Sequence, residues 1–173
     1  NMMLIGANEA ALMQQEKLFE KSGDTLKEFF GAPEIRVGGV LASTGTVLDE
    51  FHILSKGSFD GLKTVAETDA LLTDNGELKF FYRVNQNNVP EAFRKMMTDD
   101  AFALVKIGGK RYQPIYIGSA EAAVMRAEKI FDKEGDRIDS FFGNAVIVAG
   151  VLPETKSVLD AFHFVGSEFR FKK

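Results

Sequence analysis

The chain has 173 residues, of which 45% are hydrophobic and 27% are charged, and its formal net charge is −4. This length and mix are typical of a folded domain and exclude a disordered, collagen-like or low-complexity chain. The mildly acidic balance argues against a nucleic-acid partner, which would need clustered Lys and Arg. The absence of cysteine excludes thiol catalysis, disulfides and cysteine-ligated zinc.

The N-terminal segment, Asn1 to Gly6, has neither a basic region nor a full apolar core, so no signal peptide is predicted. No apolar run approaches the roughly 18 residues of a membrane-spanning helix, so we expect no transmembrane segment in this chain. The chain does not start with Met, which fits a trimmed N-terminus. The localisation of the protein is therefore left open.

Two parts of the chain repeat each other. Residues 5–31 match residues 117–143 at an offset of 112, and 15 of these 27 positions are identical. After a single-residue gap, residues 39–54 match residues 150–165 at an offset of 111, with 9 of 16 positions identical. We interpret this pattern as an internal duplication. The predicted organisation is copy 1 over 1–54, a β-rich insert over 55–112 and copy 2 over 113–173, together forming one compact domain.

Each copy is predicted to begin with a helix, near Asn8 or Ser119. In copy 1, at about 100° per residue, one helical face carries Ala11, Leu12, Gln15, Leu18 and Phe19. All of these except Gln15 are apolar. This face is expected to pack on the core, and the opposite side is expected to face solvent.

A short helix is predicted next, with Asp24 or Asp136 as its N-cap. It ends at paired phenylalanines followed by glycine, and we expect the rings in the core (Phe29, Phe30, Phe141 and Phe142). A β-hairpin completes each copy. Its strands are predicted at 34–41 and up to 54 in copy 1, and at 145–152 and up to 165 in copy 2.

The insert is predicted to be rich in strands. A tight turn at Asp74-Asn75-Gly76 precedes a strand over 78–84, and Pro90 opens a short helix through Met97. Strands over 101–107 and 110–117 flank Gly108-Gly109 as a second hairpin. After copy 2, a last short strand is predicted over 168–171.

These elements amount to about eight strands and four or five short helices. The predicted fold class is α+β: β-rich, internally duplicated as helix–short helix–β-hairpin units, and barrel-like. A pseudo-twofold axis is expected to relate the two copies, because a half-unit that cannot bury its own apolar face normally packs against its copy.

The two histidines, His52 and His163, are the first candidate site residues. They occupy equivalent positions in the two copies, each at the end of a Leu-Asp-x-Phe-His motif. Imidazole is the commonest metal ligand and an axial haem ligand, so the two rings could share one central site. The alternative is a structural role, in which each ring is buried and hydrogen-bonded within its own copy.

A stripe of acidic residues and Met recurs on the first helix of each copy. It consists of Glu9, Met13, Glu16 and Glu20 in copy 1, and of Glu121, Met125, Glu128 and Asp132 in copy 2. The thioether suits soft metals or haem iron and the carboxylate suits hard cations. The alternative is a solvated helix face on which Met is a good helix former or an anchor to another lobe.

The remaining motifs give weaker candidates. Lys106, Lys110 and Arg111 form a small basic cluster beside Tyr112, which could take an anionic ligand or be a solvated turn. Neither Gly-x-Ser-x-Gly nor His-Glu-x-x-His occurs, so a hydrolase would need a spatially assembled site.

The leading hypothesis is a non-enzymatic, internally duplicated domain that binds an unknown small ligand or a protein partner. It would be the soluble part of a larger or membrane-anchored protein. The alternative is a haem- or transition-metal-binding protein that uses the repeat-equivalent His and Met residues. The spatially assembled hydrolase is the third and weakest hypothesis.

Overall fold

The computed structural model describes residues 2–27, 29–32, 34–61, 69–85, 87–98 and 100–171. These residues form a mixed α/β structure with eleven strands, three α-helices and four short 3-10 helices, and the sheet is not closed. The prediction of a barrel-like arrangement was therefore wrong. The chain divides into two compact units, Asn1–Phe80 and Phe81–Lys173. The boundaries predicted for the copies and the insert stay a prediction.

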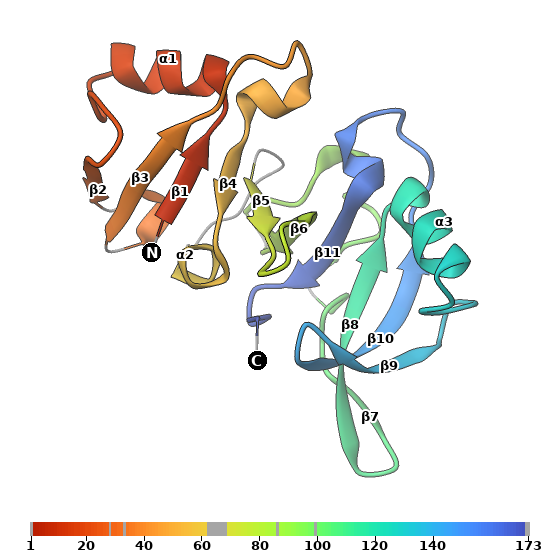
Figure 1. Cartoon of the computed structure of the whole chain (residues 1–173). Helices are drawn as coiled ribbons and strands as arrows, with labels where there is room; N and C mark the ends of the chain where they lie inside the picture. The colour runs from red at the N-terminus through yellow and green to blue at the C-terminus, as the bar shows by residue number, and fades with distance from the viewer. Residues whose placement is uncertain are drawn as a thin grey trace. The chain divides into compact units, whose positions relative to one another are not determined.

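The first unit has the strand order β2-β3-β1-β4-β5-β6. Strand β1 is parallel to β3 and antiparallel to β4, and β4 is parallel to β5. The elements of this unit, in chain order, are β1 (Met2–Ile5), α1 (Ala7–Gln15), β2 (Thr25–Lys27), η1 (Phe29–Gly31), β3 (Glu34–Val40), η2 (Val47–Glu50), β4 (His52–Leu54), α2 (Lys56–Gly61), β5 (Asp69–Leu72) and the start of β6 (Leu78–Val84) (Figure 1).

In the second unit the strand order is β6-β11-β8-β10-β9, with β7 paired to β8. Strand β8 is parallel to β10 and antiparallel to β11. The remaining elements are η3 (Glu91–Phe93), β7 (Val105–Ile107), β8 (Lys110–Ile117), α3 (Ser119–Ala127), β9 (Arg137–Phe141), β10 (Asn144–Val151), η4 (Val158–Ala161) and β11 (Phe162–Gly166).

The helices begin where the sequence predicted, but the face that they bury was predicted wrongly. Met13 is 3% exposed and packs inward with Ala10, whereas Leu12 is 50% exposed. The same is true of α3, in which Ala122 and Met125 are buried. The Met of the Glu–Met stripe is therefore buried, whereas Leu12 and Leu18 of the expected apolar face are exposed; Phe19 of that face is buried as expected.

Helix α1 ends early, which explains the part of this error that concerns Leu18. Lys17 adopts a left-handed φ of 62°, and the Leu18 N–H donates to the Met13 carbonyl in a Schellman-type cap. Lys129 and Ile130 end α3 in the same way. Leu18 lies beyond the helix, so helical spacing does not describe its direction.

The short helix and the hairpin of each copy were also predicted wrongly. Strands β2 and β9 occupy most of the segments predicted as short helices, and only a single 3-10 turn, η1, follows β2. Strand β1 lies between β3 and β4, so these two strands form no hairpin. The equivalent strand β8 separates β10 from β11.

Of the four phenylalanines expected in the core, Phe141 is 7% exposed and Phe30 is 46% exposed. Phe29 and Phe142 are half-buried. Phe30 and Phe142 both have positive φ, 44° and 51°, in the turns that follow β2 and β9. The expectation therefore holds for Phe141 and fails for Phe30.

The predictions for the insert are confirmed in part. Strand β6 occurs as predicted, and Gly76 has the positive φ of the expected turn. The hairpin at Gly108-Gly109 forms, but β7 begins at Val105 and not at residue 101, and helix α2 was not predicted. Pro90 opens only a single 3-10 turn, and residues 168–171 form no strand.

Glycine ends β1 and β8, at Gly6 and Gly118, and leads into the helix that follows. A Cβ on Gly6 would lie 2.4 Å from the Leu48 carbonyl oxygen, and one on Gly118 would lie 2.5 Å from that of Asp160. These glycines let the start of each helix pack directly against η2 or η4.

No α-helix in the described part of the chain is long and apolar enough to cross a membrane.

Candidate functional site

The two histidines lie at the start of strands β4 and β11, and a buried aspartate anchors the loop before each strand. Asp49 accepts hydrogen bonds from the Thr44 N–H, the Thr44 hydroxyl and the Gly45 N–H. Asp160 binds the equivalent Thr155 and Lys156 groups. The Thr44 N–H and hydroxyl lower the pKa of Asp49, so its carboxylate stays charged as the anchor. Both loops thus fix where the histidine strand begins.

In the first unit, carboxylates contact both ring nitrogens of His52. Its Nε2 lies 2.6 Å from Glu9 Oε2 on α1, and its Nδ1 lies 3.0 Å from Asp69 Oδ1 on β5. The ring is 3% exposed and has the edges of Phe29 and Phe30 nearby. His52 therefore joins α1 and β5 to β4 through buried contacts.

The charge state of His52 follows from these neighbours. Burial disfavours the charged ring and acts to lower the pKa of His52, but the hydrogen bond and charge of Asp69, together with Glu9, outweigh it and raise the pKa. A protonated ring donates from both nitrogens, which matches two carboxylate partners. The arrangement therefore favours an imidazolium held between two acceptors.

In the second unit, His163 pairs with the equivalent glutamate of α3, but the residue beside it on the neighbouring strand is different. Its Nε2 lies 2.5 Å from Glu121 Oε2 on α3. Its ring stacks on Phe81 of β6, with centroids 4.7 Å apart, and meets the Phe141 ring at 5.3 Å. Both histidines are thus buried and bound to a glutamate of the helix in their own copy, as the structural hypothesis expects of each ring.

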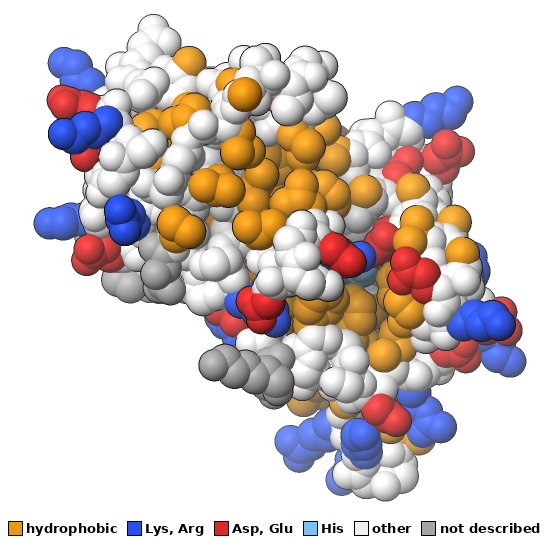
Figure 2. Space-filling view, viewed as in Figure 1, with side chains coloured by type: hydrophobic (Ala, Val, Ile, Leu, Met, Phe, Trp, Pro, Cys, Tyr) orange, Lys and Arg blue, Asp and Glu red, His pale blue; other side chains and the backbone are white. Residues whose placement is uncertain are grey.

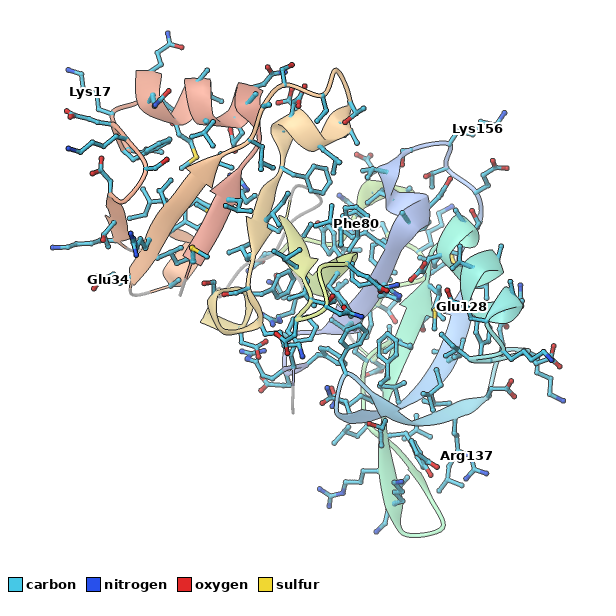
Figure 3. The ribbon with its side chains drawn as sticks, viewed as in Figure 1. Lys17, Glu34, Phe80, Glu128, Arg137 and Lys156 are labelled. Carbon is cyan, nitrogen blue, oxygen red and sulfur yellow. The ribbon has the colours of Figure 1, made fainter. Side chains whose placement is uncertain are left out.

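Sequence reasoning placed Glu9 and Glu121 among the candidate ligands but missed that each contacts the histidine. The recurrence of both residue types at nearly the same offset was the available signal. Met13 and Met125 are buried one turn further along each helix, while Glu16 and Glu128 are exposed at the helix ends, where Figure 3 labels Glu128. Among the described residues, no group of three or more His, Asp or Glu side chains is arranged to hold a metal ion.

The basic cluster lies on the β7–β8 hairpin, where Figure 2 shows Lys and Arg side chains together. Lys110 forms an exposed ion pair with Asp139 at 3.2 Å. Lys110 and Arg137 lie over the Tyr112 ring, at 5.4 and 5.6 Å from its centroid. These contacts are those of a solvated hairpin, and they engage Lys110 with an acidic neighbour.

The second unit also contains a cavity of about 660 Å³, which sequence reasoning missed. It lies between the segment that follows β6, the start of β8 and the turn after β11. Its volume falls within the range of about 300–1,000 Å³ typical of small-molecule sites. The apolar side chains in its wall are Val84, Val89, Met97, Phe102, Ala103, Leu104 and Pro114.

Several polar groups complete the wall of this cavity: Asn85, Thr98, Gln113, Ser167 and Glu168. Phe102 packs edge-to-face on Tyr116 at 5.4 Å, and a Cβ on Gly166 would lie 3.1 Å from the Phe102 Cβ. The wall is therefore held by close packing on one side. A mostly apolar cavity with a few polar groups is the usual form of a binding site for a small molecule.

Searches of protein-family models, curated proteins and solved structures gave no significant match to this chain.

Proposed function

We propose that this chain is a non-enzymatic binding protein built from a duplicated unit, and that its second unit binds a small, largely apolar ligand. The cavity of about 660 Å³ carries this proposal, because its volume suits a small molecule and its wall is mostly apolar, with Val84, Met97 and Pro114 buried. Burial of an apolar ligand there would be favourable by about 25 cal/mol for each Å² removed from water.

The duplication is part of the proposal, and local details support it. Each copy places glycine before its helix, ends the helix at a left-handed Lys and pairs a half-buried Glu with a buried His. Such details recur in two copies of one ancestral unit and have no reason to recur in unrelated segments. The pseudo-twofold relation of the copies stays a prediction.

The insert adds what the copies lack, because most of the cavity wall comes from residues 84–104. Copy 1 has no corresponding residues. In this proposal the duplicated units form the scaffold and the insert forms the specific site, as connecting segments often do.

The alternative function, haem or metal binding, is tested by a separate experiment. Both nitrogens of His52 already contact carboxylates, so binding of a metal to this ring would break one of these contacts. An absorption spectrum and a metal analysis of the purified protein test it directly, and a Soret band or stoichiometric metal that is lost in the His52→Ala/His163→Ala double mutant would favour it. Attachment to a larger or membrane-anchored protein also remains a prediction.

The neutral dye Nile red, whose fluorescence rises in apolar surroundings, tests the proposed function. We expect the wild-type chain to enhance its fluorescence, and Ala103→Trp to abolish the enhancement, because Ala103 lines the cavity and an indole there would fill it. Ala123→Trp on the exposed side of α3 is the matched control and should behave as the wild type.

Circular dichroism of both variants is the control that checks whether they fold. Equal enhancement by the wild type and by Ala103→Trp, with both folded, would show that the dye binds elsewhere and would remove the support for this cavity.

A further inference from the structure

The charge of the cavity wall limits what the ligand can carry. Among the described residues that line the cavity, Glu168 is the only charged one. Arg170 follows closely in sequence, but its guanidinium donates to the carbonyls of Ser167 and Phe169 at 2.8 Å and does not line the cavity. A carboxylate or phosphate on the ligand would meet no cation in the wall and would lie near a carboxylate.

A hydrogen-bond network fixes the direction of the Gln113 amide. The Asn144 Nδ2 donates to the backbone carbonyls of Phe142 at 3.1 Å and Arg170 at 2.6 Å. Asn144 Oδ1 is therefore an acceptor, and Gln113 Nε2 donates to it at 3.1 Å. This leaves Gln113 Oε1 as the atom of the amide that can accept a hydrogen bond from a ligand.

The other polar groups of the wall do not change this balance. Asn85 Oδ1 accepts from the Asn87 N–H at 2.8 Å, which leaves its NH₂ group as a neutral donor. The hydroxyls of Thr98 and Ser167 can each donate or accept. The wall thus combines one carboxylate, one fixed amide acceptor, one neutral amide donor and hydroxyls that adapt to either role.

We infer that the ligand of this cavity is a molecule with an apolar body and a cationic amine, rather than a fatty acid or another organic anion. This inference rests on the proposed function of the cavity. An ammonium group placed toward Glu168 and Gln113 would donate to a carboxylate and to an amide oxygen, both of which suit a cationic donor. The apolar body would contact apolar residues of the wall, such as Phe102 and Met97.

Three probes with the same alkyl chain test the inference on the full chain at fixed ionic strength: octylamine, octanol and octanoate. We expect isothermal titration calorimetry to give affinities in the order octylamine, octanol, octanoate. Because an exposed ion pair is worth little, the advantage of octylamine over octanol should be only up to about fivefold.

Glu168→Gln should reduce this advantage to near unity and leave the affinity for octanol unchanged. Glu154→Gln is the matched control, because it removes the same charge from an exposed position of the second unit that does not line the cavity. It should keep the preference for octylamine, which separates a local contact from an effect of net charge.

The outcomes distinguish the two proposals. Octanoate binding as tightly as octylamine, with octanol also bound, would overturn the cationic ligand and keep the cavity as an apolar site. An octylamine preference that Glu154→Gln removes as fully as Glu168→Gln would also overturn it. Absence of binding of all three probes would count against the proposed function itself.

Discussion

His52 and His163 occupy equivalent places on two similar units, yet their surroundings differ in kind. Each is bound by the glutamate of its helix, at 2.6 and 2.5 Å. The strand beside His52 supplies the carboxylate of Asp69, whereas β6 beside His163 supplies the ring of Phe81. Each ring thus has a glutamate and phenylalanine rings nearby, and the described difference is a second carboxylate beside His52 and the stacked Phe81 ring beside His163.

Both of the differing neighbours come from the insert. Asp69 and Phe81 lie within residues 55–112, for which no counterpart was found in the sequence. Under the proposed duplication, the copies repeat the scaffold, and the segment without a counterpart supplies the neighbour that differs between the two histidines. The same segment forms most of the cavity wall.

The largest expected effect is on the free energy of unfolding, and it compares Phe81 beside His163 with Asp69 beside His52. Phe81 is fully buried, so Phe81→Ala should lower the free energy of unfolding by about 3–5 kcal/mol. Asp69→Ala leaves a buried histidine short of one partner and should cost about 1–3 kcal/mol. Chemical denaturation followed by circular dichroism measures both.

Leu12→Ala, at an exposed helix position, is the control for these variants and should change stability by no more than about 0.5 kcal/mol. A cost for Asp69→Ala equal to or above that of Phe81→Ala would contradict the contrast between the two sites.

The second prediction asks whether the two histidines act separately. His52→Ala and His163→Ala should each lower the free energy of unfolding by about 1–3 kcal/mol, because each removes a buried ring and leaves a half-buried glutamate without its partner. The double mutant should be additive within about 0.5 kcal/mol, since each histidine contacts a glutamate of its own copy. Strong non-additivity, or a metal-dependent rise in melting temperature that His52→Ala abolishes, would instead favour one shared site.

The third prediction concerns pH. Since the folded-state pKa of His52 is raised above its ordinary value of 6.5, its protonated form stabilises the fold fully below that value. This contribution is lost as pH rises through the raised pKa. Melting temperatures measured from pH 6 upward should therefore fall less in His52→Gln than in the wild type.

Asp69→Asn removes the largest favourable influence on this pKa and should shift the NMR titration of the His52 ring to lower pH. His163→Gln is the control for the melting scans and should retain the pH dependence assigned to His52. An unchanged titration in Asp69→Asn would mean that Asp69 does not hold the proton on this ring.

The smallest expected effect compares the loops before η2 and η4. Gly45 and Lys156 occupy equivalent positions, with φ of 70° and 58°, and Figure 3 shows Lys156 pointing away from its loop. A side chain in this conformation costs about 1–2 kcal/mol. Gly45→Ala should therefore lower the free energy of unfolding by about 1 kcal/mol, and Lys156→Gly should raise it by less, because glycine also loosens the unfolded chain. A stabilising Gly45→Ala would be the contrary result.

The sequence was sufficient for elements whose pattern is local. Gly76 and Gly108-Gly109 marked their turns correctly, and both first helices begin within a residue or two of their predicted starts. The strand predicted over 145–152 is present as β10, which is paired on both sides, with β8 and β9.

The failures have physical causes that local patterns do not carry. The position of β1 between β3 and β4 depends on tertiary packing, which the local sequence does not encode. The strands β3 and β4, which follow each other in sequence, were therefore mistaken for a hairpin. The helical face of α1 was misassigned in part because Leu18 follows a left-handed residue and lies outside the helix. Asp69 has no counterpart in the repeat, so its pairing with His52 left no trace in the comparison of the copies.

The two glycines that precede α1 and α3 have a consequence for how the copies diverge. Their φ values, −61° and −60°, suit any residue, so only the carbonyls of the facing turn restrict these positions. Not even a methyl group fits, and a saturation library at Gly6 or Gly118 should recover glycine almost alone. The adjoining positions, Ala7 and Ser119, face no such limit and already differ. Under the proposed duplication, the lack of space for a Cβ atom thus explains why both copies keep glycine at this position while the sequences around it have diverged.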